Sequence, residues 1–382
     1  MNQDVILGHS FIVLDMRGDL VNAALQLCAG RVAPEKVKLF DLRERERPQG
    51  FNPLFGSGES YFRALNVLDA ITKESESFGV QLAETLRLSL LLLAEANAPI
   101  TRLEDLLTNE VYRAELLTKS NSDSSTQFWE RFNGLSPEKQ AAYVSPVMNK
   151  VSMLFATEGL RRMFGHQSSV DLGKHLNTPG TVTLISLAVD ELHAAGKMTG
   201  ALFLSSILRE IFGRVSIPEA SRVPVRMYVD EFESFNMDDF ESVLAEGRRF
   251  RLSIVLAHQV LSQLSTKVRS MILNNVGVKL VFRTGREDSQ VLSKDLTGDP
   301  KAFDLASFPP GDAVLWTRTS EPRHIEVNEP LFAVGELSAE TKQFIRELRN
   351  LTPPFEEVSR APKPEKESPT KPSKASDFEE WL

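Results

Sequence analysis

Two adjacent carboxylates at the end of a short apolar run constrain this chain more than any other feature. Residues 225–229, Val-Arg-Met-Tyr-Val, have the composition of a buried strand and lead directly into Asp230 and Glu231. Carboxylates beside a buried strand are costly unless they are paired, hydrogen-bonded or close to a cation. Open α/β folds bind ligands at the carboxyl ends of parallel strands. The pair predicts either a ligand site at such an edge or, since further acidic residues follow from Glu233, a solvated acidic turn.

The segment that follows favours the ligand site. Residues 237–250 have helical spacing, and residues 252–257, Leu-Ser-Ile-Val-Leu-Ala, form a second predicted buried strand that ends just before Gln259. This order of elements predicts a Walker B motif with a polar sensor. Asp230 would hold Mg²⁺ through water, Glu231 would orient or deprotonate the attacking water, and Gln259 would hydrogen-bond that water or a γ-phosphate.

These residues resemble the RecA-type motor core of the HerA/FtsK superfamily, and specifically the TraG/TraD-like coupling ATPases of conjugative DNA transfer. The resemblance runs from about residue 8 to about residue 319 and is most specific over residues 228–259. It implies an α/β fold, a RecA-like parallel sheet with an inserted all-α lobe. It also implies ATP and Mg²⁺ as cofactors, DNA as the substrate, and a homo-hexamer.

The resemblance also places a short polar turn near the nucleotide. Residues 11–14 predict a strand, and Asp15-Met-Arg-Gly-Asp follows it. In the family this is the second strand of the motor, which implies that Asp15 and Gly18 lie near the phosphates. Arg17 stands where a lysine is usual.

The glycine-rich phosphate-binding loop of these motors is absent from the chain. The pattern Gly-x-x-x-x-Gly-Lys-Ser/Thr occurs nowhere, and Gly56-Ser-Gly58 lacks the lysine. Because that loop supplies backbone N–H groups and a lysine to the phosphates, we expect weak ATP binding by this chain alone. Met1 falls inside a predicted helix that ends at Gly8, so we interpret the chain as a shortened copy without the first strand and loop. Alternatively, a separate polypeptide supplies them.

Several arginines are candidates for action between subunits. In ring-shaped motors an arginine of one subunit stabilises the transition state at its neighbour's γ-phosphate. The resemblance makes Arg283, Arg286 and Arg249 the candidates, in that order, with Arg248 beside the last. A surface or helix-end cation explains each of them equally well.

The periodicity divides the chain into four parts. We expect residues 1–56 to form the first part of the motor core, 57–166 the inserted all-α domain, 167–335 the remainder of the core, and 336–382 a helix and tail. The resemblance associates the all-α domain with DNA contact. The net charge of −8 argues against a broad basic surface, so DNA contact would be local, for example along a channel wall.

Cysteine content and hydropathy argue against a disulfide-rich protein, a cysteine metal site and a membrane-spanning segment. The single cysteine, Cys28, rules out an internal disulfide framework and a cysteine metal cluster. The longest apolar run, residues 88–94, is too short to span a bilayer, and no signal-peptide pattern is present. We therefore expect a cytoplasmic protein, although its relatives are often anchored at the inner membrane.

The end of the chain has a different composition. Residues 360–376 are rich in Pro, Lys, Glu and Ser and predict disorder. They lead into Asp377-Phe-Glu-Glu-Trp-Leu382, an acidic segment with two aromatic residues. We interpret Asp377, Phe378, Trp381 and Leu382 as a peptide ligand for a relaxosome or secretion-channel protein. The alternative is a tail without a partner.

Three functions fit the sequence. The first is an ATP-driven DNA translocase that acts as a coupling protein in type IV secretion. The second is a shortened or degenerate non-catalytic adaptor that binds DNA or a relaxosome protein. The third is a HerA-like helicase that works with a nuclease.

Overall fold

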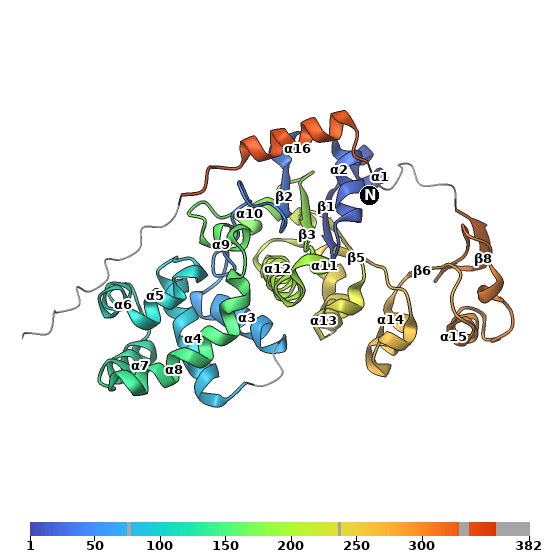
Figure 1. Ribbon diagram of the computed structural model, residues 1–382. Helices are drawn as coiled ribbons and strands as arrows, with labels where there is room; N and C mark the ends of the chain where they lie inside the picture. The colour runs from blue at the N-terminus through green and yellow to red at the C-terminus, as the bar shows by residue number, and fades with distance from the viewer. Residues whose placement is uncertain (75–77, 236–237, 328–335, 357–382) are drawn as a thin grey trace, which may run out of the picture.

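The computed structural model describes residues 1–74, 78–235, 238–327 and 336–356 (Figure 1). Its centre is a parallel five-stranded sheet in the order β2-β3-β1-β4-β5. The strands are β1 (Ser10–Asp15), β2 (Val37–Asp41), β3 (Val182–Ser186), β4 (Val225–Val229) and β5 (Leu252–Leu256). The apolar runs at residues 11–14, 225–229 and 252–257 predict β1, β4 and β5, with ends shifted by at most one residue.

Strand β1 shows why the sheet lies between two helical layers. All six of its residues are buried, and successive side chains enter different cores. Phe11 and Val13 pack in a core with α1 (Asn2–Leu7), α2 (Asp19–Cys28) and α16 (Ala339–Leu351), whereas Ile12 and Leu14 belong to the core on the opposite face. A strand buried on both faces is typical of a parallel sheet covered by helices.

Helices cover the second face and extend from it as a lobe (Figure 1). The helices beneath the sheet are α12 (Ala194–Phe212) and α13 (Asp238–Glu246), with the short α10 (Leu172–Leu176) and α11 (Val189–Leu192) beside them. Between β2 and β3 the chain forms α3 (Ser60–Lys73), α4 (Val80–Glu95), α5 (Leu103–Thr108), α6 (Glu110–Leu117), α7 (Asp123–Asn133), α8 (Pro137–Val151) and α9 (Glu158–Gly165).

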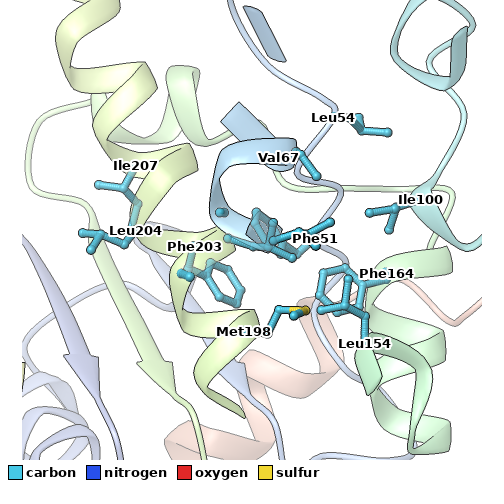
Figure 2. Packing of buried hydrophobic residues seen from close by; sticks show 14 of the residues in the cluster. Phe51, Leu54, Val67, Ile100, Leu154, Phe164, Met198, Phe203, Leu204 and Ile207 are labelled. Atoms are coloured by element: carbon cyan, nitrogen blue, oxygen red, sulfur yellow. The ribbon is translucent and has the colours of Figure 1, made fainter. Parts of the chain in front are cut away.

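The lobe and the sheet share one hydrophobic core. Phe51, in the turn that leads into the lobe, stacks on Phe203 of α12 with ring centroids 3.9 Å apart and planes inclined by 12° (Figure 2). Phe164 of α9 also contacts the Phe51 ring, with centroids 5.9 Å apart. Shared packing of this kind holds the lobe against the sheet. The predicted α/β fold with a helical insertion is confirmed, while the four domain boundaries remain a prediction.

A smaller unit follows the central sheet. After α14 (Thr266–Asn275), strands β6 (Val278–Val281), β7 (Asp312–Thr317) and β8 (Ser320–Glu326) form an antiparallel sheet that packs on α15 (Arg286–Thr297). Strand β8 is polar and contains a proline, Ser-Glu-Pro-Arg-His-Ile-Glu, and it lies at the edge of this sheet, where a proline is tolerated. The structure places these strands in a sheet of their own.

None of the helices in the described part of the chain is both long enough and apolar enough to cross a membrane. Residues 357–382, which carry the predicted disordered segment and the acidic end, lie outside the described residues.

Candidate functional site

The ends of three neighbouring strands meet at one edge of the sheet. Strand β4 pairs in parallel with β1 on one side and with β5 on the other, with Leu14 opposite Val229 and Val229 opposite Leu256. The backbone N–H of Asp230 donates to the carbonyl of Leu14 at 3.2 Å, which continues the ladder by one residue. Because the register is tight, the residues that follow each strand, Asp15, Asp230 and the segment up to Gln259, lie at the same edge.

Glu231 is held between the other two strand ends. One of its carboxylate oxygens lies 3.0 Å from the Arg17 guanidinium and also accepts a hydrogen bond from the Gln259 side-chain amide at 3.3 Å. Its backbone has φ 46° and ψ 47°, the left-handed region, which costs a non-glycine residue about 1–2 kcal/mol. The fold therefore holds this carboxylate in one position at the expense of local strain.

The Asp230 carboxyl group is partly buried beside Glu231. One of its oxygens accepts a hydrogen bond from the Glu231 backbone N–H at 3.0 Å. Burial raises the pKa of Asp230, and the neighbouring Asp15 and Glu231 carboxylates act in the same direction. Its second oxygen makes no hydrogen bond within the described part of the chain, so it is available to a water or cation.

Magnesium fits this position only with ligands from outside the protein. Among the described residues, no three His, Cys, Asp or Glu side chains are grouped so that they could hold a metal ion together. Mg²⁺ keeps several waters and binds through one or two carboxylates together with substrate phosphates. A single available carboxylate oxygen at Asp230 agrees with that mode of binding.

Asp15 and Gly18 have a clear structural role. The buried Asp15 carboxylate accepts hydrogen bonds from the backbone N–H groups of Arg17 and Val21, both at 2.9 Å, and so ties β1 to the first turn of α2. Gly18 has φ 113°, and a Cβ atom there would lie 2.9 Å from the Ser186 hydroxyl. These contacts give Asp15 and Gly18 a structural role in the turn between β1 and α2, which requires no ligand. Their contact with a nucleotide remains a prediction.

Arg43 belongs to the surroundings of the site, which the sequence did not indicate. Arg43 lies in the loop after β2, and its side chain is partly exposed. The guanidinium donates to Asp190 at 2.7 Å, to Glu191 at 2.5 Å and to the carbonyl of Arg17 at 2.7 Å. Because its carboxylate partners lie almost 150 residues away along the chain, no local pattern signals the contact. Arg43 thus supports the backbone of the residue that pairs with Glu231.

Within the described residues, no hydrogen bond or ion pair joins the three candidate arginines to Asp230 or Glu231. Arg249 precedes β5 and so lies at the amino-end edge of the sheet, opposite Asp230, with its guanidinium 5.8 Å from the Phe250 ring. Arg283 and Arg286 are exposed between β6 and α15. Within the described residues, none of these three guanidinium groups forms an ion pair. Their action on a neighbouring subunit remains a prediction.

Strand β5 forms an open edge of the central sheet. In the part of the chain that the structure describes, β5 pairs only with β4, and Val255 on its upper face is 44% exposed. The core formed by α1, α2 and α16 covers β1 and β3 but includes no residue of β5. The candidate site therefore has carboxylates, an amide and an arginine, and beside Gln259 it has an unfilled sheet edge.

The family comparison matches the part of the chain that contains these carboxylates. Residues 224–301 match the family described as the TraM recognition site of TraD and TraG. The match spans β4, Asp230, Glu231, β5, Gln259 and the elements up to α15. A comparison with curated protein sequences finds no match.

Solved structures share the fold over most of the chain. The bacterial conjugative coupling protein TrwBdeltaN70 in its unbound form is 14% identical, with a TM-score of 0.59, and the match covers 87% of this chain and 81% of that one. TrwB with the non-hydrolysable GTP analogue GDPNP is equally similar, with 82% of its chain covered. VirB4 of Thermoanaerobacter pseudethanolicus is 13% identical, with a TM-score of 0.55 and coverage of 86% and 84%.

At such identities the likeness establishes the fold. The central parallel sheet with its helical insertion is the RecA-like architecture of these proteins. The predicted resemblance to the TraG/TraD-like coupling ATPases of type IV secretion is therefore confirmed, by the family match over residues 224–301 and by a fold shared over most of the chain.

Proposed function

We propose that this chain forms the motor core of an ATP-driven DNA translocase, a cytoplasmic coupling protein of conjugative DNA transfer that works as a homo-hexamer. The observation that carries the proposal is the meeting of Asp230, Glu231 and Gln259 at the carboxyl edge of the sheet, with Arg17 bound to Glu231. The solved TrwB structures with GDPNP and with ADP and Mg²⁺ support a nucleotide and magnesium as ligands.

Each residue has a defined task in this proposal. Asp230 offers its available oxygen to a water bound to Mg²⁺, which when present neutralises charge on the phosphates. Glu231 accepts the proton of the attacking water, and Gln259 keeps the Glu231 carboxylate directed at that water. The left-handed backbone at Glu231 fixes the direction in which its side chain leaves the strand.

The open edge of β5 is where we place the phosphate-binding group. A strand paired in parallel with β5 would end beside Gln259, and the loop after it would face Asp230 and Glu231. Backbone N–H groups of such a loop, at the start of a helix, suit phosphate oxygens. The described residues supply no such loop, so we expect full activity only when one occupies this edge.

DNA and protein partners complete the proposal. The name of the matched family, the TraM recognition site of TraD and TraG, supports a relaxosome protein as a partner. Arg283, Arg286 and Arg249 would act on a neighbouring subunit. For Arg249 this is the only route, because it lies at the opposite edge of its own sheet.

ATP turnover tests the proposal. It would be measured with and without single-stranded and duplex DNA on this chain, on Glu231→Gln, and on a chain extended with a strand and a Gly-x-x-x-x-Gly-Lys-Ser/Thr loop. We expect the extended chain to hydrolyse ATP. We expect Glu231→Gln, introduced into that extended chain, to abolish ATP turnover. Glu246→Gln, at the exposed end of α13, is the matched control. Turnover that survives Glu231→Gln would refute the site.

A non-catalytic adaptor is the second candidate. The open edge at β5 and the existing ion pair between Glu231 and Arg17 both favour it. Fluorescence anisotropy with labelled DNA separates the two functions. An adaptor binds DNA without ATP, and its affinity is the same for the wild-type chain and for Glu231→Gln.

A further inference from the structure

Residues 248–251, which we call the arginine turn, precede β5 at the amino-end edge of the central sheet. Arg248, Arg249 and Arg251 are exposed, and Phe250 between them is buried. Within the described residues, no hydrogen bond or ion pair engages any of these three guanidinium groups, whereas several other arginines of the chain pair with carboxylates. The arginine turn therefore presents unneutralised positive charge on a chain whose net charge is −8.

The backbone of the arginine turn is anchored in the sheet and in the core. The carbonyl of Arg248 accepts a hydrogen bond from the N–H of Arg251 at 3.1 Å, and the carbonyl of Arg251 accepts one from Val225 of β4 at 3.0 Å. Phe250 is 4% exposed and packs edge-on against Phe212 at the end of α12, with ring centroids 5.1 Å apart. Because the turn is anchored on both sides of Phe250, its exposed side chains leave from fixed positions.

Two buried arginines bind the remaining carbonyl groups of the turn. Arg222 donates to the carbonyl of Arg249 at 2.6 Å, and Arg214 donates to the carbonyl of Phe250 at 3.1 Å. Their other hydrogen bonds also go to carbonyl groups, and in the described part of the chain no carboxylate pairs with either of them. Burial and the nearby Arg222 lower the pKa of Arg214 to about 10, which leaves it charged at neutral pH. The two buried arginines thus add to the positive charge of the three exposed ones.

The two edges of the sheet carry opposite charges. Asp230 and Glu231 follow β4, whereas the arginine turn precedes the neighbouring parallel strand β5, so the carboxylates and the guanidinium groups lie at opposite ends of these strands. The phosphates of a nucleic acid are repelled by the first edge and attracted by the second. A guanidinium group offers planar N–H donors that match phosphate oxygens, and the repeated phosphates of a backbone can engage several exposed cations at once.

We propose that the arginine turn binds the sugar-phosphate backbone of DNA through Arg248 and Arg251. The inference rests on the proposed function, in which DNA is a partner of the motor and of the adaptor alike, and it gives this contact a location outside the helical lobe. Arg249 keeps its proposed role toward a neighbouring subunit. Because phosphate contacts carry no sequence information, the contact should be equally strong for DNA of any sequence.

Fluorescence anisotropy with labelled oligonucleotides tests the proposal on this chain in the absence of ATP. Dissociation constants for single-stranded and duplex DNA would be measured from about 50 to about 200 mM salt. Arg248→Gln with Arg251→Gln removes two phosphate contacts, so the slope of log K against log salt should fall in magnitude by about 1.4 for single strands and about 1.8 for duplex. At about 0.1 M salt these slopes correspond to binding that is about 25-fold and about 60-fold weaker.

Two further variants separate charge from folding. Lys342→Gln with Arg346→Gln makes the same charge change on exposed residues of α16, and it should leave the affinity and the salt slope unchanged. Arg248→Lys with Arg251→Lys keeps both charges and should keep most of the salt slope, because the slope counts neutralised phosphates. Thermal unfolding of each variant verifies that it is folded.

Several results would overturn the proposal. They are a wild-type chain that binds no DNA, a Gln double variant with unchanged affinity and salt slope, and an equal loss in the α16 control. Poly-glutamate that binds as tightly as DNA, with the same dependence on the two arginines, would make an acidic protein the partner instead. Binding is measured without ATP, so a failure of the proposed ATP turnover and a failure of the arginine turn are separate results.

Discussion

The Arg17 guanidinium lies 3.0 Å from the Glu231 carboxylate, which joins the ends of β1 and β4 at the edge where Asp230 and Gln259 also lie. The arginine side chain is 63% exposed, so the pair contributes at most about 1 kcal/mol to stability. The main effect of the pair is to fix the position of the Glu231 carboxylate. Arg17 and Gln259 approach the same carboxylate oxygen and leave the other oxygen available for water.

Replacement of Arg17 should show whether this residue positions Glu231 for catalysis or contributes to the stability of the fold. We expect Arg17→Ala to lower kcat of the extended chain about tenfold, with little change in KM, because Glu231 loses one of two orienting contacts. The midpoint of thermal unfolding should move by only a few degrees. Arg17→Lys keeps the charge and should recover most of the rate. An unchanged kcat in Arg17→Ala would contradict the positioning role.

The strained backbone at Glu231 predicts a stabilising substitution. Glycine adopts the left-handed conformation without a Cβ clash, so Glu231→Gly should unfold with a free energy about 1 kcal/mol higher than Glu231→Gln. Urea denaturation at pH 7 measures the difference. Glu84→Gly, at an exposed position inside α4, should instead lose about 1 kcal/mol. Equal stabilities for the two Glu231 variants would show that no strain is stored there.

The raised pKa of Asp230 predicts a pH-dependent gain in stability on its removal. A carboxyl group whose pKa is higher in the folded state favours folding when it is protonated, and this advantage disappears as pH rises through the folded-state pKa. Relative to wild type, Asp230→Asn should therefore gain stability as pH rises from the ordinary value of 3.8 until the native carboxyl group is ionised. Denaturant unfolding from about pH 3.5 to about pH 7.5 follows the difference. A pH-independent difference would mean that burial does not affect this group.

His175 predicts a loss of stability in acid. Its imidazole is buried beside the carbonyl of Val182, and burial lowers its pKa from 6.5 to about 4. Because the folded protein disfavours the charged form, stability is complete above pH 6.5 and falls as pH drops toward 4, by up to about 3 kcal/mol. Unfolding free energies at about pH 7.5 and about pH 5 should differ less in His175→Gln than in wild type. Parallel losses in the two proteins would exclude His175 as the cause.

The sequence alone determined the strands and the residues at their ends. Residues 225–229 and 252–256 are apolar runs of strand length, and in a parallel sheet the residues after such runs meet at one edge. The order of these runs along the chain is therefore enough to place Asp15, Asp230 and Gln259 together. The resemblance of these segments to coupling ATPases further predicted the helical insertion between residues 57 and 166.

The tertiary structure decided how those side chains are held. The Arg17 and Gln259 contacts to Glu231, its left-handed backbone, and the capping of α2 by Asp15 depend on sub-ångström placement that no residue pattern encodes. Arg43 reaches Asp190 and Glu191 only because β2 and β3 are neighbours, although the helical lobe separates them in the chain. The periodicity of apolar residues predicts which side chains of a segment are buried. It does not predict contacts between distant segments, because these form only when the strands assemble into the sheet.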